Sequence, residues 1–180
     1  MNPLLLPRWG VARELYPTVL QAVLDYAVLV DEAGDESLEA YRALEERLQG
    51  LTGKDLSAFH LYEWWEEEGA EVLAFRIAMP DPPKLERRLS REEVADVVDR
   101  LLSGSGEFSA RPERDEDAFV ASFSLYLDVW YRRLLEWNAP RFDVRWFHRQ
   151  QDRQGNWFEH GRDDLLDLLL GLGASGGNRG

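Results

Sequence analysis

Hydrophobic residues recur at intervals of three and four over much of the chain, the spacing of one face of an α-helix. The pattern predicts a first helix that begins at Pro17, whose fixed φ suits a first turn, and ends near Gly34. Asp35 or Ser37 can cap a second helix that ends near Gly50. With these two, five to six helices are expected, the others over residues 52–68, 90–102, 118–137 and 163–172.

Two of the later helical segments carry additional signals. Ser90-Arg91-Glu92-Glu93 is a capping box, in which a serine and a glutamate three residues later satisfy each other's backbone amides. Residues 118–137 are apolar around most of the helical circumference. That distribution is typical of a helix buried in the centre of a domain.

Two other stretches indicate β-structure. Leu73, Phe75 and Ile77 alternate with a second set of side chains, and this period of two predicts a strand near 71–79. The turn-forming segment 152–156, in which Gly155 can adopt positive φ, predicts a hairpin near 142–160. Because an isolated hairpin is only marginally stable, we expect the early strand to join it in a small antiparallel sheet. The predicted class is α+β, mostly helical.

The length of the chain sets its domain organisation. At 180 residues it can form one domain that buries roughly 70% of its unfolded surface. We predict a single globular domain over residues 1–172. The glycine-rich stretch at 173–180 is expected to be a flexible tail.

Composition then excludes several classes of function. There are 34 acidic and 21 basic residues, a formal net charge of −13, which argues against nucleic acid or an anionic membrane as partner. The absence of cysteine excludes disulfides and thiolate chemistry. The N-terminus lacks a basic region and a long apolar run, so we expect a cytoplasmic protein. Lys54 and Lys84 are its two lysines, and this arginine bias fits a GC-rich bacterial genome.

The charges are unevenly distributed along the chain. Between Asp31 and Glu71 there are 13 acids and three bases, whereas six arginines and three acids lie between Arg132 and Arg153. One interpretation is that the acids form solvated helix faces and that the arginines pair internally. The other is an electronegative surface that steers a basic partner. Whether the arginine-rich segment 141–153 is functional or internally paired is left open at this stage.

Tryptophan and glutamate occur together in one short segment. Adjacent helical residues point about 100° apart, so two neighbouring tryptophans there cannot both face one core. Tryptophan is also enriched in binding hot spots. The predicted partner-binding residues are Glu63, Trp64, Trp65, Glu66, Glu67 and Glu68.

A second pattern supports an alternative. Glu67-Glu68-Gly69-Ala70-Glu71, followed by Glu93-Val94-Ala95-Asp96-Val97, resembles the paired acidic motifs of MazG-type nucleotide pyrophosphohydrolases. The resemblance implies an all-α enzyme in which carboxylates on two helices hold Mg²⁺ against a nucleoside triphosphate. By that resemblance the metal ligands are Glu68, Glu71, Glu93 and Asp96.

No other motif in the chain has catalytic spacing. His60, His148 and His160 lack metal-ligand spacing and are expected at the surface or at a sheet edge. We therefore expect a non-catalytic acidic protein without a cofactor, Mg²⁺ belonging only to the alternative. It would bind a basic protein as an inhibitor, an immunity or antitoxin-like protein or an accessory subunit, and a homodimer is left open.

Overall fold

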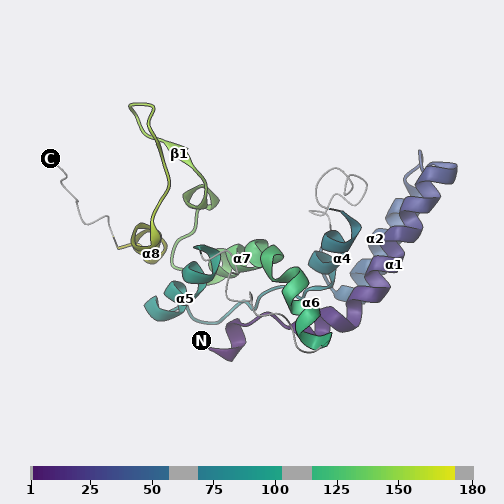
Figure 1. The fold of residues 1–180 in the computed structure, drawn as a ribbon, viewed down its shortest axis with the longest axis horizontal. Coiled ribbons are helices and arrows are strands. Elements are labelled where there is room, and N and C mark those ends of the chain that lie inside the picture. The colour runs from purple at the N-terminus through teal and green to yellow at the C-terminus, as the bar shows by residue number, and fades with distance from the viewer. Residues whose placement is uncertain (1, 57–68, 103–114, 173–180) are drawn as a thin grey trace. The chain divides into compact units, whose positions relative to one another are not determined.

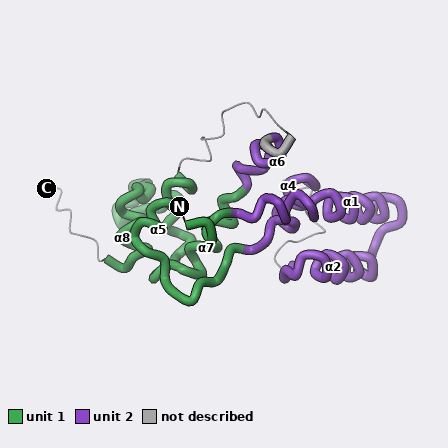
Figure 2. Tube along the Cα trace, turned by 90° about the horizontal axis from the view of Figure 1, so that it is seen from below, with its two compact units in different colours: residues 1–6, 82–111, 127–180 green, residues 7–81, 112–126 purple. Residues whose placement is uncertain are grey.

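The computed structural model describes residues 2–56, 69–102 and 115–172, which are mostly helical with one small antiparallel sheet (Figure 1). This confirms the predicted α+β class. The chain divides into two compact units (Figure 2): unit 1 is residues 1–6, 82–111 and 127–180, and unit 2 is residues 7–81 and 112–126. The single domain expected over 1–172 stays a prediction, and the tail at 173–180 lies outside the described residues.

Unit 2 has an aliphatic core between α1 (Trp9–Ala33), α2 (Glu39–Thr52) and α4 (Ala70–Ala78). Val19, Leu48 and Ile77 are fully buried in it. The helix expected from Pro17 in fact begins at Trp9, so the proline lies inside α1. Ala12 is buried upstream of the proline, and such packing offsets the hydrogen bond that proline cannot make.

An aromatic cluster attaches α6 (Asp115–Phe123) to the rest of unit 2. The rings of Phe75 and Phe123 stack with centroids 4.6 Å apart, and Phe119 meets Tyr16 edge to face at 5.3 Å. Trp9 stacks on the same Phe75 ring at 5.7 Å. Segments far apart in sequence therefore share one ring cluster.

The strand predicted near 71–79 is wrong, because residues 70–78 form helix α4. Apart from Arg76, both sets of alternating side chains are apolar and buried, including Val72, Leu73 and Ala74. A short run that is apolar in both sets has no clear period of its own, so its helical form follows from packing against α1. Glu71 in the first turn and Arg76 in the last complement the helix dipole.

A buried lysine supports the end of α4. The Lys54 side chain, 6% exposed, donates hydrogen bonds of 2.7 Å to the carbonyls of Arg76 and Met79. Its ammonium group also lies 3.6 Å from the Asp81 carboxylate. A cation at the carbonyl end of a helix satisfies acceptors that have no partner inside the helix.

The long helix predicted over 118–137 is interrupted. The chain forms α6, then the 3-10 helix η3 (Ser124–Leu127), then α7 (Asp128–Asn138). The hydroxyl of Ser122 donates to the Ala118 carbonyl at 2.9 Å, and that of Ser124 contacts the Ala121 carbonyl. Such local bonds compete with the regular helical ladder.

Unit 1 is organised around α5 (Arg91–Leu102), which packs against α7 and α8 (Arg162–Leu170). The predicted capping box of α5 is confirmed, with Ser90 and Glu93 each accepting from the other's amide. Asn138, 1% exposed, donates to the carbonyls of Pro83 and Leu134 and accepts from the amide of Leu85. The short 3-10 helix η1 (Pro3–Leu5) completes the unit at its N-terminus.

The predicted hairpin is present but shorter than expected. Its strands are β1 (Gln150–Gln151) and β2 (Trp157–Phe158), and Gly155 in the turn has φ of +85° as anticipated. Residues 144–147 form the 3-10 helix η4 (Val144–Phe147). The carboxylate of Asp143 accepts from the Arg145 amide at 2.9 Å, which bends the backbone where a strand was expected.

Candidate functional site

The predicted partner-binding residues, Glu63, Trp64, Trp65, Glu66, Glu67 and Glu68, lie outside the described residues. Their role as a contact surface therefore stays a prediction. The same holds for His60 and for most of the helix expected over 52–68. The described parts of unit 2 on either side of this segment carry the structural argument instead.

Of the four carboxylates of the nucleotide-hydrolase resemblance, the described structure places three. Glu71 is in α4 of unit 2, Glu93 and Asp96 are in α5 of unit 1, and Glu68 is outside the described residues. Over the described ranges, no three histidine, aspartate or glutamate side chains are grouped to hold a metal ion.

Glu93 has a structural role that occupies its carboxylate. Its oxygens accept from both terminal nitrogens of Arg87, at 2.6 and 2.7 Å, from the Ser90 amide at 2.9 Å and from Asn2 at 3.2 Å. The Arg87 guanidinium is the main cause of a Glu93 pKa of about 2. A carboxylate with these partners does not fit an Mg²⁺ ligand.

The division into units reveals where the net charge resides. Unit 1 contains 14 basic and 14 acidic residues, whereas unit 2 contains seven basic and 20 acidic residues. The formal charge of −13 therefore belongs entirely to unit 2. The acidic block noticed in the sequence is a property of one structural unit.

The connection between α1 and α2 concentrates this charge. Residues 31–39, which we call the acidic tip, contain five carboxylates within nine residues. Asp35 is turned inward: it accepts from the amides of Ala40 at 3.2 Å and Tyr41 at 2.8 Å, and so caps α2 as predicted. Burial, followed by the nearby Asp35 carboxylate, raises the pKa of Tyr26.

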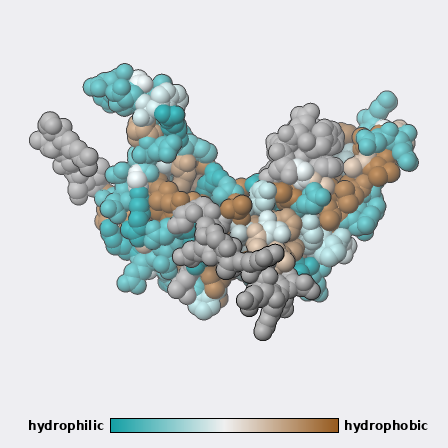
Figure 3. Space-filling model, in the orientation of Figure 1, coloured by the Kyte–Doolittle hydropathy of each residue, from teal (hydrophilic) through white to brown (hydrophobic). Residues whose placement is uncertain are grey.

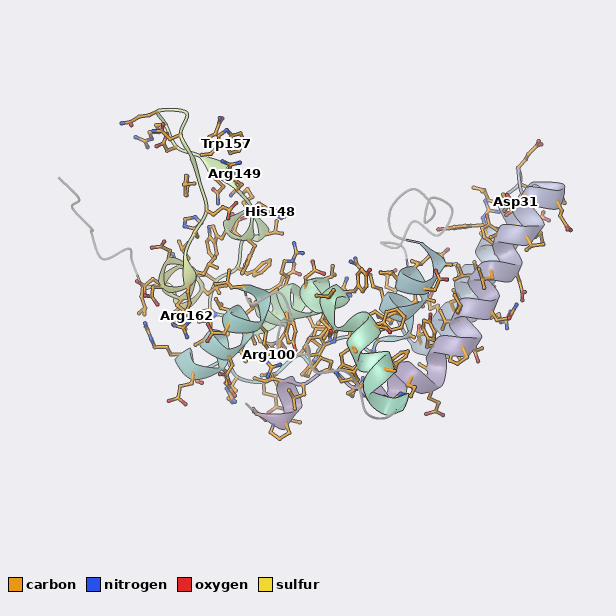
Figure 4. The ribbon with its side chains drawn as sticks, in the orientation of Figure 1. Asp31, Arg100, His148, Arg149, Trp157 and Arg162 are labelled. Carbon is orange, nitrogen blue, oxygen red and sulfur yellow. The ribbon has the colours of Figure 1, made fainter. Side chains whose placement is uncertain are left out.

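The remaining carboxylates of the acidic tip face solvent. Asp31 is labelled at the end of α1 in Figure 4. Like Glu32, Glu36 and Glu39, it is exposed and makes no ion pair with any residue that the structure describes. Asp31 and Glu32 lie in the last turn of α1, the negative end of the helix dipole, where a carboxylate is unfavourable.

Leu38 is an apolar residue in the middle of the acidic tip. Its side chain is 46% exposed, and its φ of 58° lies in the left-handed region, uncommon for residues other than glycine. Leu38 sits at the N-cap position of α2 and makes no side-chain capping bond. An exposed leucine held in a strained backbone is the kind of outlier that marks a functional position.

A second apolar feature lies on the outer face of α1. Leu24 and Val28 are 39% and 55% exposed and are one helical turn apart. Asp25, Asp31 and Glu32 lie on the neighbouring exposed positions of the helix. Figure 3 shows hydrophobic residues between hydrophilic ones over α1 and α2.

The sequence predicted the charge of this region but missed its apolar anchors. Val28 and Leu38 belong to series of apolar residues at helical spacing, and such a series predicts a buried face. One signal was available for Leu38, which follows Gly34 to Ser37, a stretch rich in turn-forming and capping residues. A leucine at such a helix boundary need not belong to the core.

Arginines of the hairpin region have partners inside unit 1. The carboxylate of Asp143 binds Arg145, which lowers the Asp143 pKa to about 2. Arg132 pairs with Asp128 one turn before it in α7. The guanidinium of Arg149 lies 5.3 Å from the centroid of the Trp157 ring. Within the arginine-rich segment 141–153, Arg145 is thus paired internally, whereas Arg132 lies before that segment in α7.

Comparison with known proteins gives no relative for this chain. No family model matches it, and neither a curated protein nor a solved structure does. Among the described helices, none combines the length and the apolar character needed to cross a membrane. We therefore infer function from the residues themselves.

Proposed function

We propose that this chain is a non-catalytic interaction protein whose unit 2 binds a protein with a basic surface. The role would be that of an inhibitor, an immunity or antitoxin-like protein, or an accessory subunit. The observation that carries the proposal is the exposure of Leu24, Val28 and Leu38 at the carboxylate-rich end of the α1–α2 pair. Apolar anchors supply binding energy, and surrounding charges steer the encounter.

The partner surface that fits these features best is an amphipathic basic helix. Leu24 and Val28 form a short apolar ridge on α1, which suits the groove of another helix. Lysine or arginine on either side of the partner's apolar stripe would meet Asp25 and Glu32. Leu38 would enter an apolar pocket at the end of the contact.

Stability considerations support a binding role for the acidic tip. A carboxylate at the negative end of a helix costs about 0.3–1 kcal/mol, and a non-glycine residue in a sparsely populated φ/ψ region costs about 1–3 kcal/mol. Asp31, Glu32 and Leu38 carry such costs together within nine residues. A cationic partner would offset the part of this cost that comes from the carboxylates of Asp31 and Glu32.

A binding assay with a defined probe tests the proposal. The probe is an amphipathic peptide of leucine and lysine about 18 residues long, or roughly five helical turns, with a leucine–glutamate version as its control. The acidic-tip variant is E32Q/E36Q/E39Q, and the matched variant E86Q/E92Q/E136Q removes three exposed glutamates from unit 1. We expect the acidic-tip variant to weaken lysine-peptide binding by about tenfold or more, which is about 1.4 kcal/mol.

The matched unit 1 variant should change binding by less than about twofold, because its carboxylates do not line the contact. Equal losses in both variants would mean that only total charge matters. Equal binding of the lysine and glutamate peptides would also contradict the proposal. In a separate variant, Leu38→Asn keeps a residue that tolerates left-handed φ and removes the apolar anchor. It should weaken binding severalfold without lowering thermal stability.

The alternative, an Mg²⁺-dependent MazG-like nucleotide pyrophosphohydrolase, has one observation in its favour. Residues 70–78 are helical, as that resemblance requires of the segment with Glu71. Against it, the carboxylate of Glu93 is held by Arg87 and Asn2. Measurement of pyrophosphate release from a nucleotide panel with Mg²⁺, compared with Glu71→Gln, tests this alternative directly. Release that depends on Glu71 would replace the interaction proposal.

A further inference from the structure

A cavity of about 380 Å³ lies in unit 1 beside the hairpin. Its apolar lining comes from Leu101 and Leu102 of α5 and from Leu165 of α8. Trp146 and Phe147 of η4 add two aromatic side chains. Its volume falls within the roughly 300–1,000 Å³ of small-molecule sites, and apolar walls with a few polar groups are typical of them.

The polar lining contains one closed ion pair and two open charges. Asp128 and Arg132 line the cavity and neutralise each other. Arg149 and Glu159 also line it, yet neither makes an ion pair with any residue in the described ranges. The cavity is therefore balanced in charge while presenting one available cation and one available anion.

The hairpin register explains how these groups come together. Gln151 pairs with Trp157 and Gln150 with Phe158, so the next positions in register are Arg149 with Glu159 and His148 with His160. The ladder ends before them, and all four side chains line the cavity. Figure 4 shows His148 and Arg149 along one arm of the hairpin, with Trp157 beside Arg149.

We propose that this cavity binds a small aromatic zwitterion, such as an aromatic α-amino acid. Its carboxylate would meet the guanidinium of Arg149, its ammonium group the carboxylate of Glu159, and its ring Trp146 and Phe147. His148 and His160 add hydrogen-bonding groups at the hairpin. The proposal is independent of the acidic tip, which belongs to unit 2.

Other ligand classes fit this lining less well. A wholly apolar ligand would cover Arg149 and Glu159 without partners, and burying unpaired charges is costly. A polyphosphate would need several free cations, whereas Arg132 is already bound to Asp128. A zwitterion with an apolar ring satisfies both open charges and the aromatic lining at once.

The sequence contained a signal for this site that was missed. The expected turn is centred on Gln154, so residues equally far from it on either side are opposite each other in the hairpin. Arg149 and Glu159 are each five residues away, and His148 and His160 are each six. Applying the register to the predicted hairpin would have grouped these four residues.

A series of probes that share one ring tests the proposal by calorimetry at pH 7.5 with the full chain. L-phenylalanine carries both charges, 3-phenylpropanoate only the carboxylate, and 2-phenylethylamine only the ammonium group. We expect L-phenylalanine to bind about tenfold or more tightly than either singly charged probe. The reason is that each charge-assisted hydrogen bond contributes about 1.5–3 kcal/mol, which corresponds to a roughly 10- to 100-fold change in affinity.

Two variants assign the contacts separately. Arg149→Gln should weaken L-phenylalanine and 3-phenylpropanoate about tenfold and leave 2-phenylethylamine unchanged. Glu159→Gln should weaken L-phenylalanine and 2-phenylethylamine and leave 3-phenylpropanoate unchanged. Arg153→Gln, at the exposed turn outside the cavity lining, is the matched control and should bind all three probes as the parent does.

Folding of each variant is checked by circular dichroism. Should Arg149→Gln be unfolded, Arg149→Lys keeps the charge and should retain most of the preference for the carboxylate. Equal affinity for all three probes would overturn the proposal. So would no detectable binding of L-phenylalanine at about 10 mM, a concentration beyond the millimolar limit of weak specific sites, or binding unchanged by both Arg149→Gln and Glu159→Gln.

Discussion

The two units divide the chain into halves of 90 residues each and differ completely in charge. Unit 1 is formally neutral, whereas unit 2 holds the whole −13. In unit 1 many charged side chains contact each other, as Arg87 does with Glu93 and Arg162 with Asp99. In unit 2 the carboxylates of the acidic tip other than Asp35 are exposed to solvent. Unit 2 also uses charge structurally at Lys54 and Asp35, but its excess of carboxylates leaves several of them available for binding.

The interiors of the two units also differ. Unit 2 is held by aliphatic packing and by the ring cluster around Phe75. Both units also contain buried polar side chains, and Asn138 of unit 1 is more deeply buried than Lys54 of unit 2. This difference predicts that replacing a large apolar side chain by alanine lowers the free energy of unfolding most in unit 2. Removing one hydrogen-bonding side chain should lower it most in unit 1.

The largest effect is expected from Phe75→Ala. This ring is 1% exposed and stacks on both Trp9 and Phe123, so its removal leaves a cavity at the centre of unit 2. The free energy of unfolding should fall by about 3–5 kcal/mol, measured by urea denaturation. Phe142→Ala, a partly buried ring of unit 1 that meets Phe147 at 5.9 Å, is the control with a smaller loss. Equal losses of unfolding free energy in the two variants would contradict the difference expected between the two units.

Asn138→Ala should cost about 2–4 kcal/mol in the same measurement. It removes three side-chain hydrogen bonds and leaves the amide of Leu85 and the carbonyl of Pro83 without their partner. Gln154→Ala at the exposed turn is the control and should change stability by less than about 0.5 kcal/mol. A loss below about 1 kcal/mol for Asn138→Ala would mean that this junction does not hold unit 1 together.

Acid should weaken the Arg87–Glu93 junction in a defined range. Because the folded pKa of Glu93 is lowered to about 2, its stabilisation is complete above the ordinary value near 4.5 and is lost as pH falls towards 2. Glu93→Gln should therefore lower stability by about 1 kcal/mol at neutral pH and by progressively less in acid. Denaturation midpoints from pH 7 to pH 2, with Glu92→Gln as control, measure this. A difference that does not depend on pH would contradict the assignment.

The smallest effect has the opposite sign. Asp31→Asn with Glu32→Gln should raise stability by about 0.5–1 kcal/mol, because it removes like charge from the negative end of α1. Asp163→Asn, in the first turn of α8, should lower stability by a similar or smaller amount. Thermal unfolding at low salt measures both. A stability loss in the α1 variant would show that its carboxylates have structural partners, and would count against the acidic tip as a binding surface.

Local chemistry made much of the fold predictable from sequence. The capping box at Ser90, the cap at Asp35 and the positive φ at Gly155 depend on neighbouring residues and were predicted correctly. The wrong predictions concern segments whose conformation depends on tertiary packing. Residues 70–78 are helical because α1 packs against them, and α1 passes through Pro17 because its earlier turns are also packed.

The candidate sites were predictable only in part. Sequence located the acidic block, since charge is read directly from composition, and it placed Gly155 in a hairpin turn. The hydrophobic pattern alone did not reveal that Leu38 is exposed, because it does not distinguish a core leucine from one at a helix boundary. It also could not show that Arg149 and Glu159 line a cavity without an ion pair to any described residue, which depends on where the ladder ends.

The interleaving of the two units has a consequence for synthesis on the ribosome. Residues 7–81 of unit 2 emerge first, but the ring cluster needs Phe119 and Phe123, which follow an intervening segment of unit 1. At about 5–20 residues per second, the 45 residues from 82 to 126 take roughly 2–9 s to be made. For that interval Phe75 can stack on Trp9 but lacks its second partner Phe123, so part of the ring cluster stays exposed on the nascent chain.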